Sequence, residues 1–177
     1  MKLTLHLTRN TLLYIFRILL GCYLTWALLS IVRVDKREWA LISVIIVSEP
    51  DFENLRSATA SRVINTLNGC VVGLLFLLVA GVNFYSLLGA VAVSSLIGTS
   101  FPKYPSSWKV APVTVVIVMI TSILGHFGLN DALRTALTRT GEVLIGCGTA
   151  FLLGWAFSYL PKKKEGVSLI EAPSFIF

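Results

Sequence analysis

Six apolar stretches separated by short polar segments dominate the hydropathy pattern of this chain. A helix that crosses the hydrocarbon core of a bilayer needs roughly 20 apolar residues, and most of these stretches approach or exceed that length. The second, with about 12 residues, is short, so it needs flanking residues or a thinned or protein-lined region. The pattern predicts six transmembrane helices at about residues 11–32, 38–49, 57–80, 83–100, 109–127 and 133–160.

Residues that break or cap helices mark the ends of these stretches. Pro102, Pro105 and the Ser106-Ser107 pair separate the fourth stretch from the fifth. Asn130 or Asp131 can cap the sixth helix, and Pro161 follows its end. We therefore expect one transmembrane domain over residues 1–161 and a short cytoplasmic tail over 162–177.

The composition supports the membrane assignment. The chain is 55% hydrophobic and 14% charged, with a mean hydropathy of +0.81, which is far more apolar than a soluble domain. No small-residue cleavage site with a mature domain follows the first stretch, so we expect this helix to be retained rather than removed as a signal peptide. The fold class predicted is an all-α integral membrane protein.

The basic residues predict how the chain lies in the membrane. Six spans place nine Lys and Arg side chains on the side of both termini and five on the opposite side. The cytoplasmic side carries the excess of positive charge, so both termini are expected in the cytoplasm of a multi-pass protein of the inner (plasma) membrane. The net charge of +6 reflects these helix ends, and no basic patch with interleaved aromatic residues indicates a nucleic-acid partner.

A sequence motif occurs twice, 77 positions apart. The segment from Arg62 to Cys70 returns from Arg139 to Cys147, with Arg, Leu, Gly and Cys at identical spacings. Residues 40–47 and 111–118 form a second, weaker pair. Chance similarity between apolar helices is the alternative to duplication.

We interpret the motif as two units, repeat one at about 10–81 and repeat two at about 82–160. Each unit contains three spans, and three is an odd number. If both units share one fold, the second therefore enters the membrane upside down, which makes an inverted 3+3 repeat.

The two repeated arginines are the main candidates for a functional site. A charge close to the hydrocarbon must face protein, water or headgroups. Arg62 and Arg139 therefore either attract an anion along a transport path, one near each face, or extend to lipid phosphate. Glu142 is three residues after Arg139, so it either neutralises that arginine or couples transport to protons. Asn65 occupies the equivalent position in repeat one.

Arg17 and the Glu49-Pro50 motif are further candidates. Arg17 lies in the middle of the first apolar stretch, where a charge is costly unless it is paired or hydrated. It either lies on a water-filled path or pairs with a residue such as Glu49 or Asp51. Glu49 and Pro50 stop the short second helix, and a capping loop is a more ordinary role for them than substrate contact.

Small residues predict where helices pack closely. They form two ridges, which favour the third and sixth helices as the central pair: Gly69 with Gly73, and Gly146 with Ala150 and Gly154. Four tryptophans and a tyrosine are typical of interfacial anchors: Trp26, Trp39, Trp108, Trp155 and Tyr159.

No nucleophile and base pair, phosphate-binding loop or metal-ligand spacing occurs in the sequence, so we expect no enzyme activity, cofactor or metal. Cys22, Cys70 and Cys147 lie in apolar stretches and are expected to serve in packing. His6 and His126 are single histidines that are expected to be structural.

These residues together resemble the fusaric acid resistance and aromatic acid exporter superfamily. The resemblance rests on Trp39 to Pro50, on Leu55-Arg56, and on Arg62 with Thr66 and Gly69. In that family a short apolar helix ends in a polar residue and proline, and the next helix carries Arg-x-x-Gly-Thr-x-x-Gly. Asn65 replaces the glycine before Thr66 here. The segment from Arg139 through Glu142 to Gly146 is similar to a later helix of the family.

The resemblance, which covers about residues 10–160, implies a six-helix domain that exports organic or aromatic acids across the inner membrane. Many relatives carry a second membrane half or a soluble domain, so we expect this chain to form a homodimer or a larger homo-oligomer. The sequence favours a transporter or channel subunit for a small organic anion. The alternative is a non-transporting subunit or scaffold that stabilises a partner membrane protein.

Overall fold

The computed structural model describes residues 9–32, 34, 37–100, 109–125 and 129–159, and the regular structure within them is entirely α-helical. The all-α architecture is therefore confirmed. The helices lie close to the six predicted stretches: α1 (Arg9–Ile31), α2 (Glu38–Val47), α3 (Phe52–Ala80), α4 (Phe84–Ser100), α5 (Val110–Gly125) and α6 (Leu129–Ser158).

Two long helices begin earlier than the hydropathy pattern indicates. The side chain of Asp51 accepts a hydrogen bond of 3.3 Å from the backbone N–H of Asn54, which satisfies a free N–H group at the start of α3. This cap lets α3 begin within the polar segment at Phe52 rather than at 57.

The sixth helix likewise begins at Leu129 rather than at 133. Asn130 and Asp131 consequently lie inside its first turn, and the prediction that one of them caps the helix is wrong. The predicted breaks at 102–107 and at 161 lie outside the described residues.

The described helices differ in how far they can extend across a bilayer. Three are long and apolar enough to cross, at Asn10–Ile31, Phe52–Ala80 and Leu129–Ser158. The others are shorter apolar helices, and α2 has 10 residues. At 1.5 Å per residue α2 extends about 15 Å, roughly half of the 30 Å hydrocarbon core. The chain is thus a membrane protein with three clear candidate spans, and six crossings remain a prediction.

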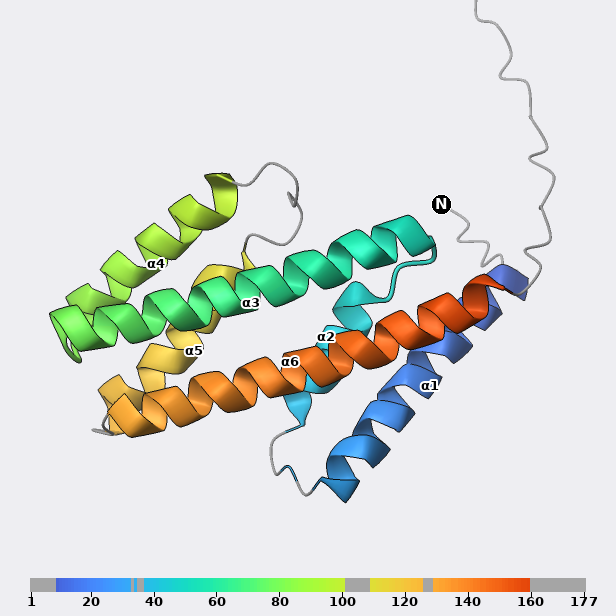
Figure 1. Cartoon of the computed structure of the whole chain (residues 1–177), viewed down its shortest axis with the longest axis horizontal. Coiled ribbons are helices and arrows are strands. Elements are labelled where there is room, and N and C mark those ends of the chain that lie inside the picture. Colours follow the sequence, from blue (N-terminus) through green and yellow to red (C-terminus); the bar gives the residue numbers. More distant parts are fainter. Residues whose placement is uncertain (1–8, 33, 35–36, 101–108, 126–128, 160–177) are drawn as a thin grey trace, which may run out of the picture.

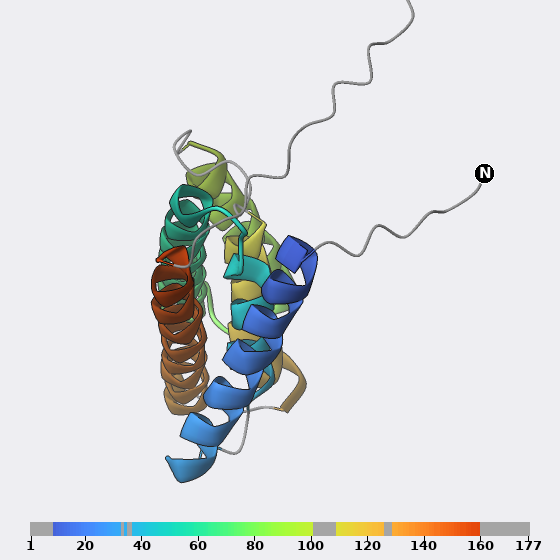
Figure 2. The ribbon, with the colours of Figure 1, turned by 90° about the vertical axis from the view of Figure 1, so that its right-hand side faces the viewer.

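The helices form two layers. Helices α3 and α6 lie side by side and run in opposite directions along one face (Figure 1). The shorter α5 packs behind α3, and α2 packs behind α6, as the view turned by 90° shows (Figure 2). Helix α4 flanks α3 and α5, whereas α1 flanks α2 and α6. Each of the other helices therefore contacts at least one of the two long helices α3 and α6.

Two glycines allow the layers to approach closely. A Cβ atom at Gly69 would collide with the backbone oxygen of Ala111 in α5, and a Cβ atom at Gly146 would collide with the backbone oxygen of Ala40 in α2. Each long helix therefore touches its short partner backbone to backbone, as small residues permit in membrane proteins.

The glycine ridges mostly face the short helices α5 and α2. The small residues favour α3 and α6 as the central pair, and these helices do pack together. However, Gly69 and Gly73 face α5, and Gly146 and Ala150 lie against α2, whereas Gly154 meets Leu55 of α3. Periodicity identifies residues that share a helix face, but it does not say which helix covers that face.

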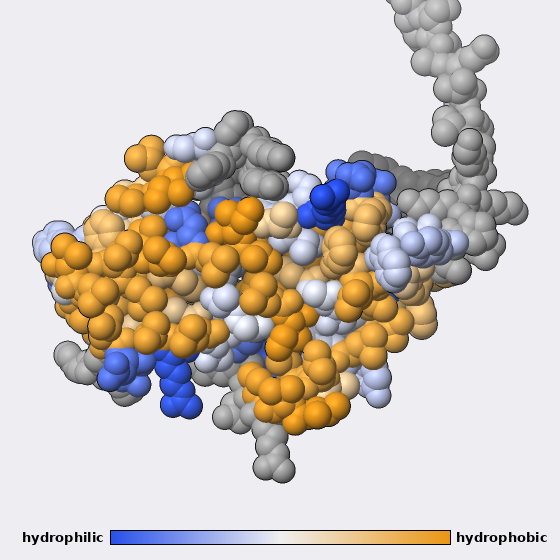
Figure 3. All heavy atoms as spheres, viewed as in Figure 1, coloured by the Kyte–Doolittle hydropathy of each residue, from blue (hydrophilic) through white to orange (hydrophobic). Residues whose placement is uncertain are grey.

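The outer face of α3 and α6 is apolar. Figure 3 shows that this side of the molecule is largely hydrophobic. Large apolar side chains line the face on both helices and are roughly half exposed. They are Ile64, Leu67, Val71, Leu75 and Leu78 on α3, and Leu133, Leu137, Leu144, Leu152 and Trp155 on α6. Such a continuous surface is typical of helices that face lipid or another membrane helix.

Candidate functional site

The repeated arginines lie inside the protein. Arg62 is 4% exposed and Arg139 is 3% exposed, and each follows the first residue of its helix by ten positions. At 1.5 Å per residue, each lies about 15 Å from the start of its helix. This is deeper than the sequence pattern indicates, because both helices begin earlier than expected.

Both guanidinium groups carry nitrogen atoms without hydrogen bonds. Nε and Nη2 of Arg62, and Nε and Nη1 of Arg139, are buried and meet no hydrogen-bond partner among the described residues. The two groups also lie close enough to repel one another. Burial of this kind favours a role inside the protein over contact with lipid phosphate, which requires an exposed charged end.

The surroundings of the two arginines differ. Cζ of Arg139 lies 3.3 Å from the centroid of the Trp39 ring, a cation–π contact, and Glu142 attracts the same guanidinium. Near Arg62, the equivalent of Glu142 is the neutral Asn65, which donates hydrogen bonds to the backbone oxygen and hydroxyl of Ser61 at 2.9 and 3.2 Å. The pair of arginines and Glu142 thus carries one more positive than negative charge.

Trp39 is a neighbour of this site that the sequence analysis missed. It was expected to anchor the chain at the membrane interface, but it is half-buried beneath Arg139. Its place at the start of the short α2 gave no signal of this contact, because the two residues are 100 positions apart and meet only when α2 packs on α6.

Arg17 and Tyr14 hold the end of α2. Nη2 of Arg17 donates to the backbone oxygen of Glu49, and the Tyr14 hydroxyl donates to the backbone oxygen of Ser48 at 2.6 Å. Carbonyl groups at the last turn of a helix lack partners within that helix. Arg17 therefore contacts the main chain of the Glu49-Pro50 motif and supplies donors where the short helix stops.

The cysteines and histidines named in the sequence analysis are the remaining candidate groups. Cys22 is half-buried, and Cys70 and Cys147 are buried; all three are free thiols. The described residues contain no group of three or more His, Cys, Asp or Glu side chains that could hold a metal ion. His6 and His126 lie outside the part of the chain that the structure describes.

The fold and these buried charges define an all-helical integral membrane protein with ionisable groups at the packed centre of its helices. The profile of the fusaric acid resistance protein-like family matches residues 11–153, so the chain belongs to this family. It is similar to the inner membrane protein YccS of Escherichia coli (strain K12), with 21% identity over 93% of this chain. The match covers 23% of YccS, so the chain spans about a quarter of this relative's length. No solved structure gives a significant match.

Membership confirms the resemblance drawn from the Trp39 to Pro50 and Arg62 to Gly69 segments. The family and the apolar helices together show a membrane protein, and the similar protein YccS is an inner membrane protein.

Proposed function

We propose that the chain forms an inner-membrane transporter or channel subunit for small organic acid anions and works in efflux. The observation that carries this proposal is the pair Arg62 and Arg139, two buried guanidinium groups with free hydrogen-bond donors at equivalent positions of α3 and α6.

The charges at this centre favour an anion. Burying positive charge in a low-dielectric region is costly, and Glu142 offsets one of the two arginines. A carboxylate that approaches the centre balances the remaining charge and accepts hydrogen bonds from the free nitrogens. Each charge-assisted hydrogen bond contributes roughly 1.5–3 kcal/mol. A cation would meet repulsion at the same place, so the centre selects by charge.

The packing of the helices supports an inverted repeat. The repeat makes α1, α2 and α3 the counterparts of α4, α5 and α6. The helix contacts follow this correspondence, because α3 packs on α5 just as α6 packs on α2. Gly69 of repeat one lies against Ala111 of repeat two, and its counterpart Gly146 of repeat two lies against Ala40 of repeat one. The same contact therefore occurs twice, with the two repeats exchanged. Helices α3 and α6 run in opposite directions (Figure 1). These relations support a pseudo-twofold axis, which an inverted repeat would place in the membrane plane, an arrangement common in transporters.

A second candidate function is that of a non-transporting subunit which stabilises a partner. The match to about a quarter of YccS favours it, because a protein that corresponds to one part of a longer relative can depend on a partner for the remaining parts. The apolar outer face of α3 and α6 offers a surface for a second copy, and we expect at least a homodimer.

Reconstitution separates the two candidates. The purified protein in liposomes is expected to carry benzoate across the membrane with no added partner and to exclude choline, a cation of similar size. Benzoate flux equal to that of protein-free liposomes, from protein shown to be folded, would contradict the transporter and favour the scaffold.

A further inference from the structure

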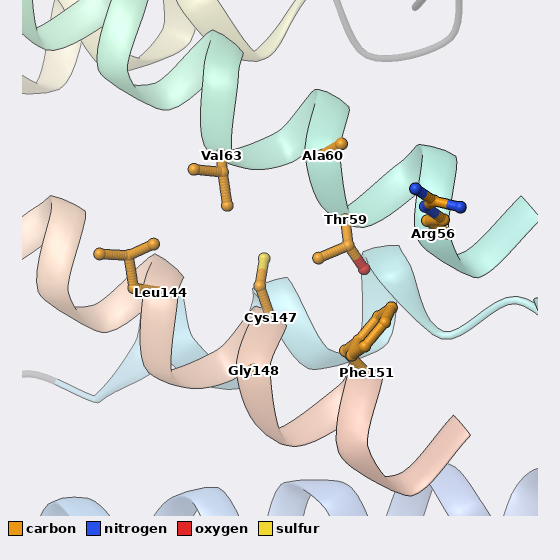
Figure 4. A pocket seen from close by; sticks show the side chains of 8 residues that line it. All are labelled: Arg56, Thr59, Ala60, Val63, Leu144, Cys147, Gly148 and Phe151. Carbon is orange, nitrogen blue, oxygen red and sulfur yellow. The ribbon is translucent and has the colours of Figure 1, made fainter. Parts of the chain in front are cut away.

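A groove lies between α3 and α6 on one side of their crossing. It has a volume of about 370 Å³, within the range of roughly 300–1,000 Å³ that is typical of ligand sites, and its surface is almost entirely apolar. Figure 4 shows α3 on one side and α6 on the other, with the Cys147 sulfur pointing between them. The lining residues are Arg56, Thr59, Ala60, Val63, Leu144, Cys147, Gly148 and Phe151.

Polar groups occupy one end of this apolar groove. Arg56 is exposed, and Thr59, one turn later on the same face of α3, has a buried hydroxyl oxygen without a hydrogen-bond partner among the described residues. Toward the centre of the molecule, Cys147 lies close enough to Arg62 to interact with it electrostatically. The groove therefore runs from an exposed cation and a free hydroxyl to the neighbourhood of a buried arginine.

The cysteines on the two sides of the crossing have different surroundings. The repeat equivalent of Cys147 is Cys70, whose sulfur lies 3.7 Å from the backbone oxygen of Ala136 and 3.6 Å from the Thr140 hydroxyl oxygen. Helices α3 and α6 thus meet directly at Cys70, whereas Cys147 lines the groove between them. Arg62 lies close to Cys147 in this groove, whereas Arg139 lies close to Cys70.

We propose that this groove is a binding site for a compact amphipathic carboxylate, whose charged group binds Arg56 and the Thr59 hydroxyl and whose apolar body lies against Val63, Cys147 and Phe151. The proposal rests on the transport function proposed above, since it names where the anion binds before it reaches Arg62. Arg56 supplies the complementary charge, and the free hydroxyl of Thr59 supplies a donor.

The dimensions favour a compact acid over a lipid. On α6 the lining extends over the eight residues from Leu144 to Phe151, or about 10 Å at the helical rise. A lipid acyl chain crosses one leaflet, about 15 Å or half of the hydrocarbon core. A ring-sized apolar body fits the groove, whereas an acyl chain extends beyond it.

Two glycines of α6 provide a matched test. A Cβ atom at Gly148 or at Gly141 meets no atom within 4 Å, so both positions accept a side chain, but only Gly148 lines the groove. Binding of 1-naphthoate to the purified protein in phosphatidylcholine nanodiscs would be measured by titration calorimetry. Gly148→Leu is expected to weaken binding at least tenfold and Gly141→Leu to leave it unchanged. Thr59→Val and Arg56→Gln are each expected to weaken it severalfold.

Equal naphthoate affinity in the two leucine variants, both correctly folded by melting temperature, would overturn the groove site. Acetate is expected to compete poorly because it lacks the apolar body. Palmitate binding tighter than naphthoate, or loss of naphthoate binding on adding phosphatidylglycerol, would assign the groove to lipid and overturn the proposal. If Gly148→Leu leaves both binding and flux intact while Arg62→Gln removes flux, the groove fails and the proposed function stands.

Discussion

The sequence repeat identifies the two arginines and the two glycines of the central helices, but their environments depend on tertiary packing. Identical spacing predicts that Arg62 and Arg139 take equivalent places, and both are buried. It does not predict that Trp39 covers Arg139, because that contact joins helices distant in sequence. Nor does it predict the depth of the arginines, since that depends on where polar residues extend α3 and α6.

The closest helix contacts should respond to one added methyl group. In Gly146→Ala the new Cβ would collide with the Ala40 backbone oxygen, so α6 and α2 must separate. Overpacking destabilises the fold by about 1–3 kcal/mol, whereas the better helix propensity of alanine stabilises it by about 1 kcal/mol. We expect a lower melting temperature in detergent for Gly146→Ala. The control Gly148→Ala, with open space at its Cβ, should melt at or above the wild-type temperature; equal melting of both variants contradicts the close contact.

At the scale of elements, hydropathy locates the helices within a few residues and fails where polar residues belong to a helix. Asp51 starts α3 before its apolar stretch begins. The short α2 is explained by its end: Tyr14 and Arg17 of α1 bind the backbone oxygens of Ser48 and Glu49. The sequence pattern shows that the helix ends before Pro50. It does not show which helix supplies the hydrogen-bond donors for the free carbonyl groups at that end.

Removing one of these donors should loosen α1 from α2. Tyr14→Phe loses a hydrogen bond of 2.6 Å to the Ser48 oxygen, which contributes about 1 kcal/mol. For a chain of this size that is a decrease of roughly 2–4 °C in melting temperature. Tyr23→Phe, the same change at a 69% exposed position of α1, is the control and should melt like the wild type. A decrease of the same size in both variants would show that the hydroxyl of Tyr14 has no special role.

At the scale of the whole molecule, composition and hydropathy predict a helical membrane protein, and the two-layer arrangement around α3 and α6 agrees with a duplicated chain. The different surroundings of Cys70 and Cys147 could not be predicted, because the two copies of the motif have the same spacing around both cysteines. The number of crossings and the orientation depend on the bilayer itself.

The charge bias predicts the orientation. The start of α3 should face the cytoplasm and the start of α6 the opposite side. Single cysteines at Ser57 and Asp131, both exposed, test this in a background in which the three native cysteines are replaced. In intact spheroplasts an impermeant maleimide should label position 131 at once and position 57 only after lysis. The reverse pattern would invert the proposed topology.

Anion flux through arginine variants shows whether Arg62 and Arg139 bind the transported anion, as we propose. Benzoate efflux from proteoliposomes should fall at least tenfold for Arg62→Gln and for Arg139→Gln, which matches a loss of about 1.4 kcal/mol. Lysine keeps the charge but loses the paired donors, so Arg→Lys should give intermediate flux. Arg134→Gln, an exposed arginine of α6, is the control and should transport normally. Unchanged flux in both buried Gln variants, inserted at the normal level, would contradict anion binding by these two arginines.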